Sequence, residues 1–92
     1  MRTGKGVTIR IYGRVHGVGF RYSAASEAQK LGIVGFAEND PDGPVHIEAE
    51  GEEIALKKFL AWCRKGPLFA KVERVEAEWS EATGKFSDFS AG

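Results

Sequence analysis

The sequence has few or none of the features that indicate a disulfide, a cysteine metal site, a charged partner or a membrane segment. Cys63 is the only cysteine among 92 residues, which excludes an internal disulfide and any metal site built from several cysteines. Thirteen basic residues balance thirteen acidic ones, so no net charge attracts nucleic acid or an anionic membrane. No long apolar run is present that would span a membrane or act as a signal segment. We therefore expect a cytoplasmic protein with neither nucleic acid nor membrane as a partner.

Side chains for nucleophilic or metal chemistry are also scarce. The two histidines, His16 and His46, have no acidic or cysteine partner at metal-ligand spacing, so we predict no metal site and no cofactor. No serine, cysteine or histidine is placed as an activated nucleophile. The glutamates between positions 48 and 53 are divided between a strand and a helix start, and we interpret them as a solvated surface. Cys63 lies on the apolar stripe of a helix and is interpreted as a core residue.

A length of 92 residues predicts one domain, residues 1–92, with a single modest core. Alternating apolar residues predict four strands, at 7–12, 33–39, 45–50 and 75–79, and 86–89 is a candidate for a short fifth strand. Apolar residues at helical spacing predict two helices. The first carries Ala24, Ala28 and Leu31 and ends at Gly32; the second carries Leu56, Phe59, Leu60 and Cys63 and ends at Gly66.

The predicted order of elements is βαββαβ with an appended strand. Each helix has one apolar stripe and each strand one apolar face, so both helices should cover the same side of the sheet. This is an α+β, ferredoxin-like sandwich: an antiparallel sheet of four to five strands with two helices on one face. A right-handed crossover makes the first two strands parallel. Their ends therefore share one edge of the sheet, which should bring the segment 17–21 close to Asn39.

Residues 13–21, GRVHGVGFR, lie between the first strand and the first helix. Glycines allow backbone N–H groups to converge on one point, and a helix N-terminus adds partial positive charge there. Arg21 falls in the first helical turn and could close the same hollow with its forked, charged guanidinium. The segment is suited to a small tetrahedral anion, and we interpret that anion as a phosphoryl group. The glycine spacing fits neither nucleotide-binding fingerprint, and on spacing alone a plain tight turn remains the alternative.

The whole nonapeptide closely resembles the signature loop of the acylphosphatase family. Further segments stand in the order that this family shows, namely GFAEN at 35–39, DG at 42–43 and GP at 66–67. The resemblance covers nearly the whole chain and implies the same ferredoxin-like architecture. It also implies the activity, which is hydrolysis of the carboxyl–phosphate anhydride bond of acyl phosphates to a carboxylate and inorganic phosphate.

The resemblance assigns roles to particular residues. Arg21 would bind the phosphoryl group, and Asn39 would orient the attacking water. Each has a simpler interpretation, Arg21 as a solvated helix residue and Asn39 as a turn residue that caps its own backbone. Two positions depart from the family pattern, since Glu38 stands where a basic residue is frequent and Pro44 where a small hydroxyl residue is usual. The phosphate-binding residues implied by the family loop are Val15, His16, Gly17, Val18, Gly19, Phe20 and Arg21.

So small a set of polar groups suits this reaction. The leaving carboxylate needs no protonation, and a loose phosphoryl-transfer transition state mainly requires positioning and charge stabilisation. We expect a metal-independent, monomeric enzyme whose partners are a small acyl phosphate and inorganic phosphate, the latter as product and inhibitor. The proton acceptor for the water stays open, and the substrate's own phosphate oxygens are a candidate.

Two other functions compete with this one. A non-catalytic anion-binding module, like the acylphosphatase-like domain at the start of hydrogenase-maturation proteins, would share the loop. The chain ends after one predicted domain, and we take this to favour the free-standing enzyme. An RNA-binding domain would display aromatic and basic residues on the open sheet face. We expect one aromatic there, and reject RNA, because the face should carry Thr8, Arg10, Tyr12, His46, Glu48 and Glu50.

Overall fold

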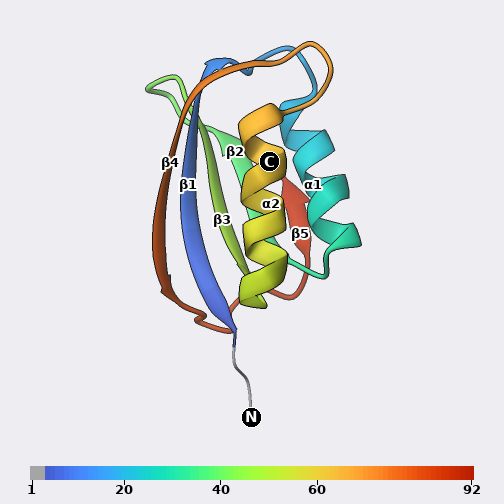
Figure 1. Cartoon of the computed structure of the whole chain (residues 1–92), viewed down its shortest axis with the longest axis vertical. Coiled ribbons are helices and arrows are strands. Elements are labelled where there is room, and N and C mark those ends of the chain that lie inside the picture. Colours follow the sequence, from blue (N-terminus) through green and yellow to red (C-terminus); the bar gives the residue numbers. More distant parts are fainter. Residues whose placement is uncertain (1–3) are drawn as a thin grey trace.

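The computed structural model describes residues 4–92, which form five strands and two helices (Figure 1). The predicted order βαββαβ with an appended strand is confirmed; the first three residues of the predicted domain lie outside the described residues. The elements are β1 (Lys5–Arg14), α1 (Phe20–Lys30), β2 (Val34–Asn39), β3 (Val45–Gly51), α2 (Glu53–Lys65), β4 (Lys71–Glu81) and β5 (Phe89–Ala91).

The sheet has the strand order β4-β1-β3-β2-β5. Its first four strands are antiparallel neighbours, but β5 pairs parallel to β2, so the prediction of a wholly antiparallel sheet was wrong for this strand. The reason is the path of the chain. Because Glu81 at the end of β4 pairs with Lys5 at the start of β1, β4 ends at the edge where β2 begins. A strand that enters from that edge beside β2 must run parallel to it.

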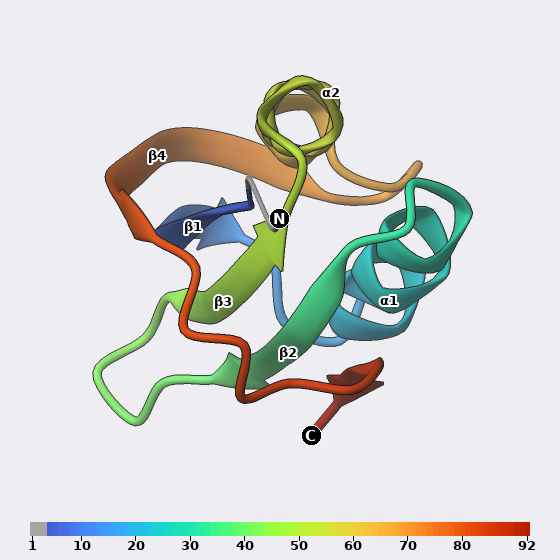
Figure 2. The ribbon, with the colours of Figure 1, turned by 90° about the horizontal axis from the view of Figure 1, so that it is seen from below.

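The core lies between the sheet and the two helices, which cover the same face (Figure 2). Period-two alternation directs one side of each central strand inward, and both helices turn their apolar stripes towards that side. Gly32, with φ of 71°, follows the end of α1 in the left-handed conformation expected of it. The strands and helices contribute buried residues that include Val7, Ile9, Ile11, Val45, Ile47, Ala24, Ala28, Leu56, Phe59 and Cys63.

The open face of the sheet differs from the prediction at Phe36 and Glu50. Phe36 of β2 stacks on His46 with 6.0 Å between ring centroids, and Phe86 packs edge-on against it at 5.8 Å. With Tyr12, this face carries three aromatic residues rather than one. Glu50 is not solvated but 7% exposed, because it accepts hydrogen bonds from Thr83 and Gly84. The segment 82–88 therefore crosses the open face on its way to β5.

The topology brings the carboxyl ends of two strands to one edge of the sheet. β1 and β2 both pair antiparallel with β3, so they run parallel and their carboxyl ends lie at the same edge. The chain leaves that end of β1 for α1 and leaves that end of β2 through a turn to β3. The predicted approach of the 17–21 segment to Asn39 follows from this arrangement. In the part of the chain described, neither helix is long and apolar enough to cross a membrane.

Candidate active site

The loop between β1 and α1 is anchored at both ends in the core. Val15 and Phe20 are 2% and 1% exposed, and the Phe20 ring packs against Trp62 of α2 at a centroid distance of 5.4 Å. Between them, Gly17 and Gly19 have φ angles of 70° and 75°, which L side chains rarely adopt. A Cβ at either glycine would meet no atom within 4 Å, so the backbone angle alone requires glycine there.

Gly19 is also the N-cap of α1, and its carbonyl accepts the first helical hydrogen bond from the N–H of Ser23, at 3.0 Å. Among residues 4–92, no side chain caps this helix start. The first amide groups of a helix have no acceptor within the helix, and the helix dipole places partial positive charge at this end. The start of α1 is therefore equipped to receive an anion.

The loop and the end of β2 line one hollow of about 200 Å³. Its lining includes both Arg21 and Asn39, which the sequence predicted would face one site. Of the predicted phosphate-binding residues, Val18 does not line the hollow and packs against the core instead. Tyr22, which the sequence did not single out, does line it and is 67% exposed. The lining residues are Val15, His16, Gly17, Gly19, Phe20, Arg21, Tyr22 and Asn39.

The guanidinium of Arg21 is held in place by Gly92, the residue that follows β5. Its Nη1–H donates to a main-chain oxygen of Gly92, whose own N–H donates to the carbonyl of Ala37 at 2.8 Å. The guanidinium carbon also lies 5.6 Å from the centre of the Tyr22 ring. Because a guanidinium has five N–H donors, one bond to Gly92 leaves others for a ligand. Arg21 is thus not simply a solvated helix residue.

Asn39 ends β2 and is exposed, directly before a tight turn. Asp40, rather than Asn39, caps that turn, since the N–H of Asp42 donates to Asp40 Oδ1 at 3.0 Å. The turn is closed further by backbone bonds from Asp40 N–H to the Pro44 carbonyl, 2.8 Å, and from Gly43 N–H to the Asp40 carbonyl, 2.9 Å. The turn-capping role that competed for Asn39 is therefore filled by its neighbour.

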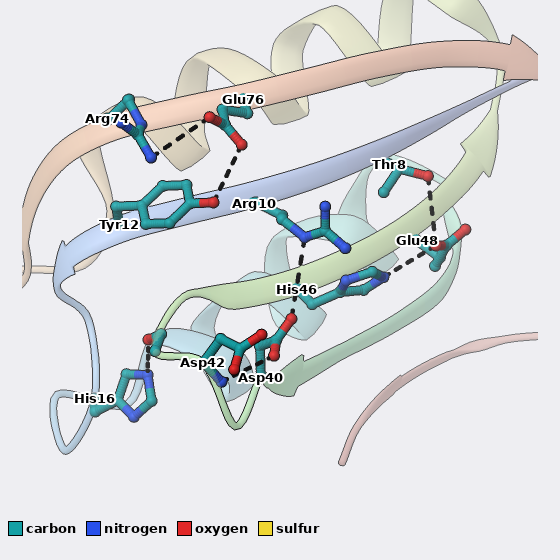
Figure 3. A network of polar contacts seen from close by, with 11 residues as sticks. Thr8, Arg10, Tyr12, His16, Asp40, Asp42, His46, Glu48, Arg74 and Glu76 are labelled. Atoms are coloured by element: carbon teal, nitrogen blue, oxygen red, sulfur yellow. Dashed lines mark hydrogen bonds and ion pairs between the residues drawn. The ribbon is translucent and has the colours of Figure 1, made fainter.

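His16 connects the loop with this turn (Figure 3). Its Nε2 lies 2.6 Å from the carbonyl oxygen of Gly43. No sequence pattern predicts this contact, because the acceptor is a backbone group that every residue possesses. His46, by contrast, lies on the open face of the sheet as predicted, with its Nε2 3.0 Å from Glu48 Oε2.

Other features of the chain offer less chemistry. Between residues 4 and 92, no three His, Cys, Asp or Glu side chains are grouped to hold a metal ion. Burial raises the pKa of the Cys63 thiol far above its usual range, which keeps it uncharged and unreactive. A larger hollow of about 420 Å³ on the open face is lined by Phe36, Phe86 and Lys85 among others. It contains no helix start and no glycine loop.

The α+β domain thus has one hollow in which Arg21, the start of α1 and Asn39 lie together. Comparison with known proteins identifies its class further. The acylphosphatase family model matches residues 7–91, and the chain belongs to the acylphosphatase family. The resemblance seen in the sequence is thereby confirmed.

Individual relatives agree with this assignment. The chain is 47% identical over 76 residues to an acylphosphatase of Thermococcus kodakarensis, covering 83% of this chain and 84% of that protein. It is 45% identical over 85 residues to an acylphosphatase of Caldanaerobacter subterraneus subsp. tengcongensis, covering 92% and 94%. The crystal structure of acylphosphatase from Bacillus subtilis superposes with a TM-score of 0.91 at 38% identity, covering 96% of this chain and 98% of the other.

Proposed function

We propose that this chain hydrolyses acyl phosphates to a carboxylate and inorganic phosphate. The observation that carries the proposal is the hollow in which the glycine loop, Arg21 and Asn39 meet. Membership of the acylphosphatase family supports this activity, as do relatives of that name at 45% and 47% identity that match most of the chain.

The phosphoryl group occupies the loop in this proposal. The unpaired amide groups at the start of α1 donate to its oxygens, and Arg21 supplies the fixed positive charge. The bond to the main-chain oxygen of Gly92 orients the guanidinium before substrate arrives, so less side-chain freedom is lost on binding. The same donors stabilise the charge that spreads over the equatorial oxygens in the transition state.

Asn39 orients the attacking water. Its amide oxygen accepts a hydrogen bond from the water and its amide nitrogen can donate one, whereas a carboxylate at this position would repel the phosphate. As the new P–O bond forms, the bond to the acyl oxygen breaks and its electron pair leaves with the carboxylate. That product is stable without a proton, so no general acid is needed. The proton released by the water passes to a phosphate oxygen of the substrate.

The other features proposed are those of a small, independent enzyme. We propose a single domain over 1–92, a monomer, a cytoplasmic location and a reaction that uses no metal or cofactor and involves neither nucleic acid nor membrane. The scarcity of metal-ligating groups, the zero net charge and the short, amphipathic helices support these proposals.

A non-catalytic anion-binding module is the second candidate, and one solved structure bears on it. The crystal structure of full-length HypF in the phosphate- and nucleotide-bound form contains a region that superposes on this chain with a TM-score of 0.87 at 25% identity. The chain covers only 12% of that protein, whereas it covers 84% and 94% of the acylphosphatases described above. The enzyme is therefore the better-supported proposal.

Incubation with benzoyl phosphate tests the proposal. We expect enzyme-dependent loss of the anhydride with stoichiometric release of benzoate and phosphate, and an unchanged rate after exhaustive chelation, because Arg21 and backbone donors provide the positive charge. A folded chain that binds phosphate but leaves benzoyl phosphate intact would instead be the non-catalytic module. Loss of the rate on chelation and its return with magnesium or zinc would contradict metal independence.

A further inference from the structure

His16 joins two segments that each supply half of the proposed site. It belongs to the phosphate loop, and its Nε2 lies 2.6 Å from the carbonyl oxygen of Gly43 in the turn that follows Asn39 (Figure 3). We propose that His16 is a positioning residue, whose side chain fixes the distance between the phosphate-binding loop and Asn39. The inference rests on the proposed function for its catalytic consequence, although the contact itself does not.

The acceptor of this bond is firmly held. The turn is closed by two backbone hydrogen bonds between Asp40 and residues Gly43 and Pro44, and by the Asp40 carboxylate, which accepts from the Asp42 N–H. Pro44, at the far end of the turn, is buried and leads directly into β3. Arg10 of β1 adds a longer ion pair, with its Nε 4.0 Å from Asp40 Oδ2. The Gly43 carbonyl is therefore a fixed point beside Asn39.

The loop on the other side of the bond has less support of its own. Gly17 and Gly19 are exposed, and glycine gives a backbone more freedom than any other residue. Val15 and Phe20 anchor the ends of the loop, and His16, which is exposed, lies between Val15 and the two glycines. A side-chain bond from His16 to the rigid turn restricts that freedom. It thereby sets where the bound phosphorus atom lies relative to the water on Asn39.

The acceptor also determines the state of the imidazole. A carbonyl oxygen can only accept, so Nε2 must carry the hydrogen. Neutral imidazole in its Nε2–H form and protonated imidazole both satisfy this, and the bond should therefore persist as pH changes. The charged or titratable groups that share the hollow or the turn are Arg21, Tyr22, Asp40 and Asp42. A positioning role thus differs from a role as a cation on the phosphate, which would depend on protonation.

Two variants separate these roles. His16→Gln places an amide N–H close to the position of Nε2 and should keep the bond, while His16→Asn places it near Nδ1 and cannot reach Gly43. Both replacements are polar and uncharged. We expect His16→Gln to keep kcat for benzoyl phosphate within about twofold and His16→Asn to lower it roughly tenfold, because a misplacement of about 1 Å can cost up to a hundredfold.

Sulfate inhibition supplies the second measurement. Sulfate is a tetrahedral dianion that does not titrate near neutral pH, and Arg21 and the loop amides that should bind it are intact in both variants. We therefore expect its inhibition constant to be the same in wild type, His16→Gln and His16→Asn, and melting temperatures should confirm that all three are folded. If sulfate binding weakened along with kcat in both variants, His16 would belong to the anion-binding set and the positioning role would be refuted.

Nuclear magnetic resonance tests the contact without any activity. The ¹⁵N spectrum of neutral His16 should show the Nε2–H form, and the side-chain amide signals of Asn39 should move in His16→Asn but not in His16→Gln. An Nδ1–H form, unmoved Asn39 signals or wild-type kcat in His16→Asn would each overturn the inference. A wild-type chain that shows the expected spectra but hydrolyses no acyl phosphate would refute the proposed function and leave the contact standing.

Discussion

Arg21 and Asn39 line the same hollow, but their proposed roles differ enough to fail differently when each is removed. Arg21→Ala deletes the charge that holds the phosphoryl group in both the ground state and the transition state, so KM should rise and kcat fall. Asn39→Ala keeps the cradle but loses the oriented water. We expect kcat to fall about a hundredfold or more with little change in KM. Steady-state kinetics with benzoyl phosphate measures both effects.

Arg21→Lys is the matched control for this pair, since it keeps the charge but loses the fork and the planar geometry. It should recover part of the binding lost in Arg21→Ala. If Asn39→Ala retained wild-type turnover, the attacking water would have to be oriented by another group, and Asn39 would be only the last residue of β2.

The sequence identified two residues of the candidate site, but it did not reveal the contacts that position the site. Arg21 and Asn39 stood out because their side chains and spacing matched a known loop pattern. The bonds from His16 to Gly43 and from Arg21 to Gly92 join residues 27 and 71 positions apart. Both end on main-chain oxygens, which carry no residue-specific signal. Such contacts depend on how β2, its turn and β5 are placed, and only the folded chain shows them.

Among the elements, the segment 82–88 is held at its start by the carboxylate of Glu50. Glu50 of β3 accepts three hydrogen bonds, from the Thr83 N–H at 2.9 Å, the Thr83 hydroxyl at 2.7 Å and the Gly84 N–H at 3.0 Å. Burial alone would raise the pKa of Glu50, but these donors outweigh it and hold the pKa below its usual value. The ionised carboxylate therefore stabilises the fold, and it connects β3 to the segment leading into β5.

Glu50→Gln should destabilise the protein in a pH-dependent way. Because the pKa is lower in the folded state, the stabilisation by Glu50 is complete above the unfolded pKa of about 4.3 and is lost as pH falls through the folded pKa. We expect Glu50→Gln to cost about 1–3 kcal/mol at neutral pH and to approach wild-type stability in acid. Thermal melts followed by circular dichroism from neutral to acidic pH, with exposed Glu52→Gln as control, measure this. A gap between the variants that stayed constant into acid would contradict it.

The order of the helices and strands was predictable from the sequence, but the direction of β5 was not. Period-two and helical spacings record directly which face of each strand or helix is buried, so β1, α1, β2, β3, α2 and β4 could be recognised from the sequence. The direction of β5 depends on the connection before it. That connection is held to the open face by Glu50 and by Phe86 against Phe36, contacts between distant segments that no local pattern encodes.

For the molecule as a whole, the proposed cradle should couple ligand binding to stability. Inorganic phosphate is a product of the proposed reaction and keeps the tetrahedral charge that the loop would hold. A ligand that binds only the folded state, at ten times its dissociation constant, adds roughly 1.4 kcal/mol to the free energy of unfolding. For a domain of this size, that corresponds to a rise in melting temperature of about 6–11 °C, taking 4–8 °C per kcal/mol. Differential scanning calorimetry measures the rise directly.

Phosphate also stabilises proteins generally, because it is excluded from their surfaces, so the shift must be compared between variants. Arg21→Ala should lose most of the specific rise, since the guanidinium is the main charge in the hollow. Asn39→Ala should keep it, because orienting water plays no part in holding the product. Comparing the phosphate-induced rise in melting temperature of the two variants therefore separates phosphate binding from catalysis. An equal rise in wild type and Arg21→Ala would show that the loop binds no phosphate, and the proposed mechanism would fail at its first step.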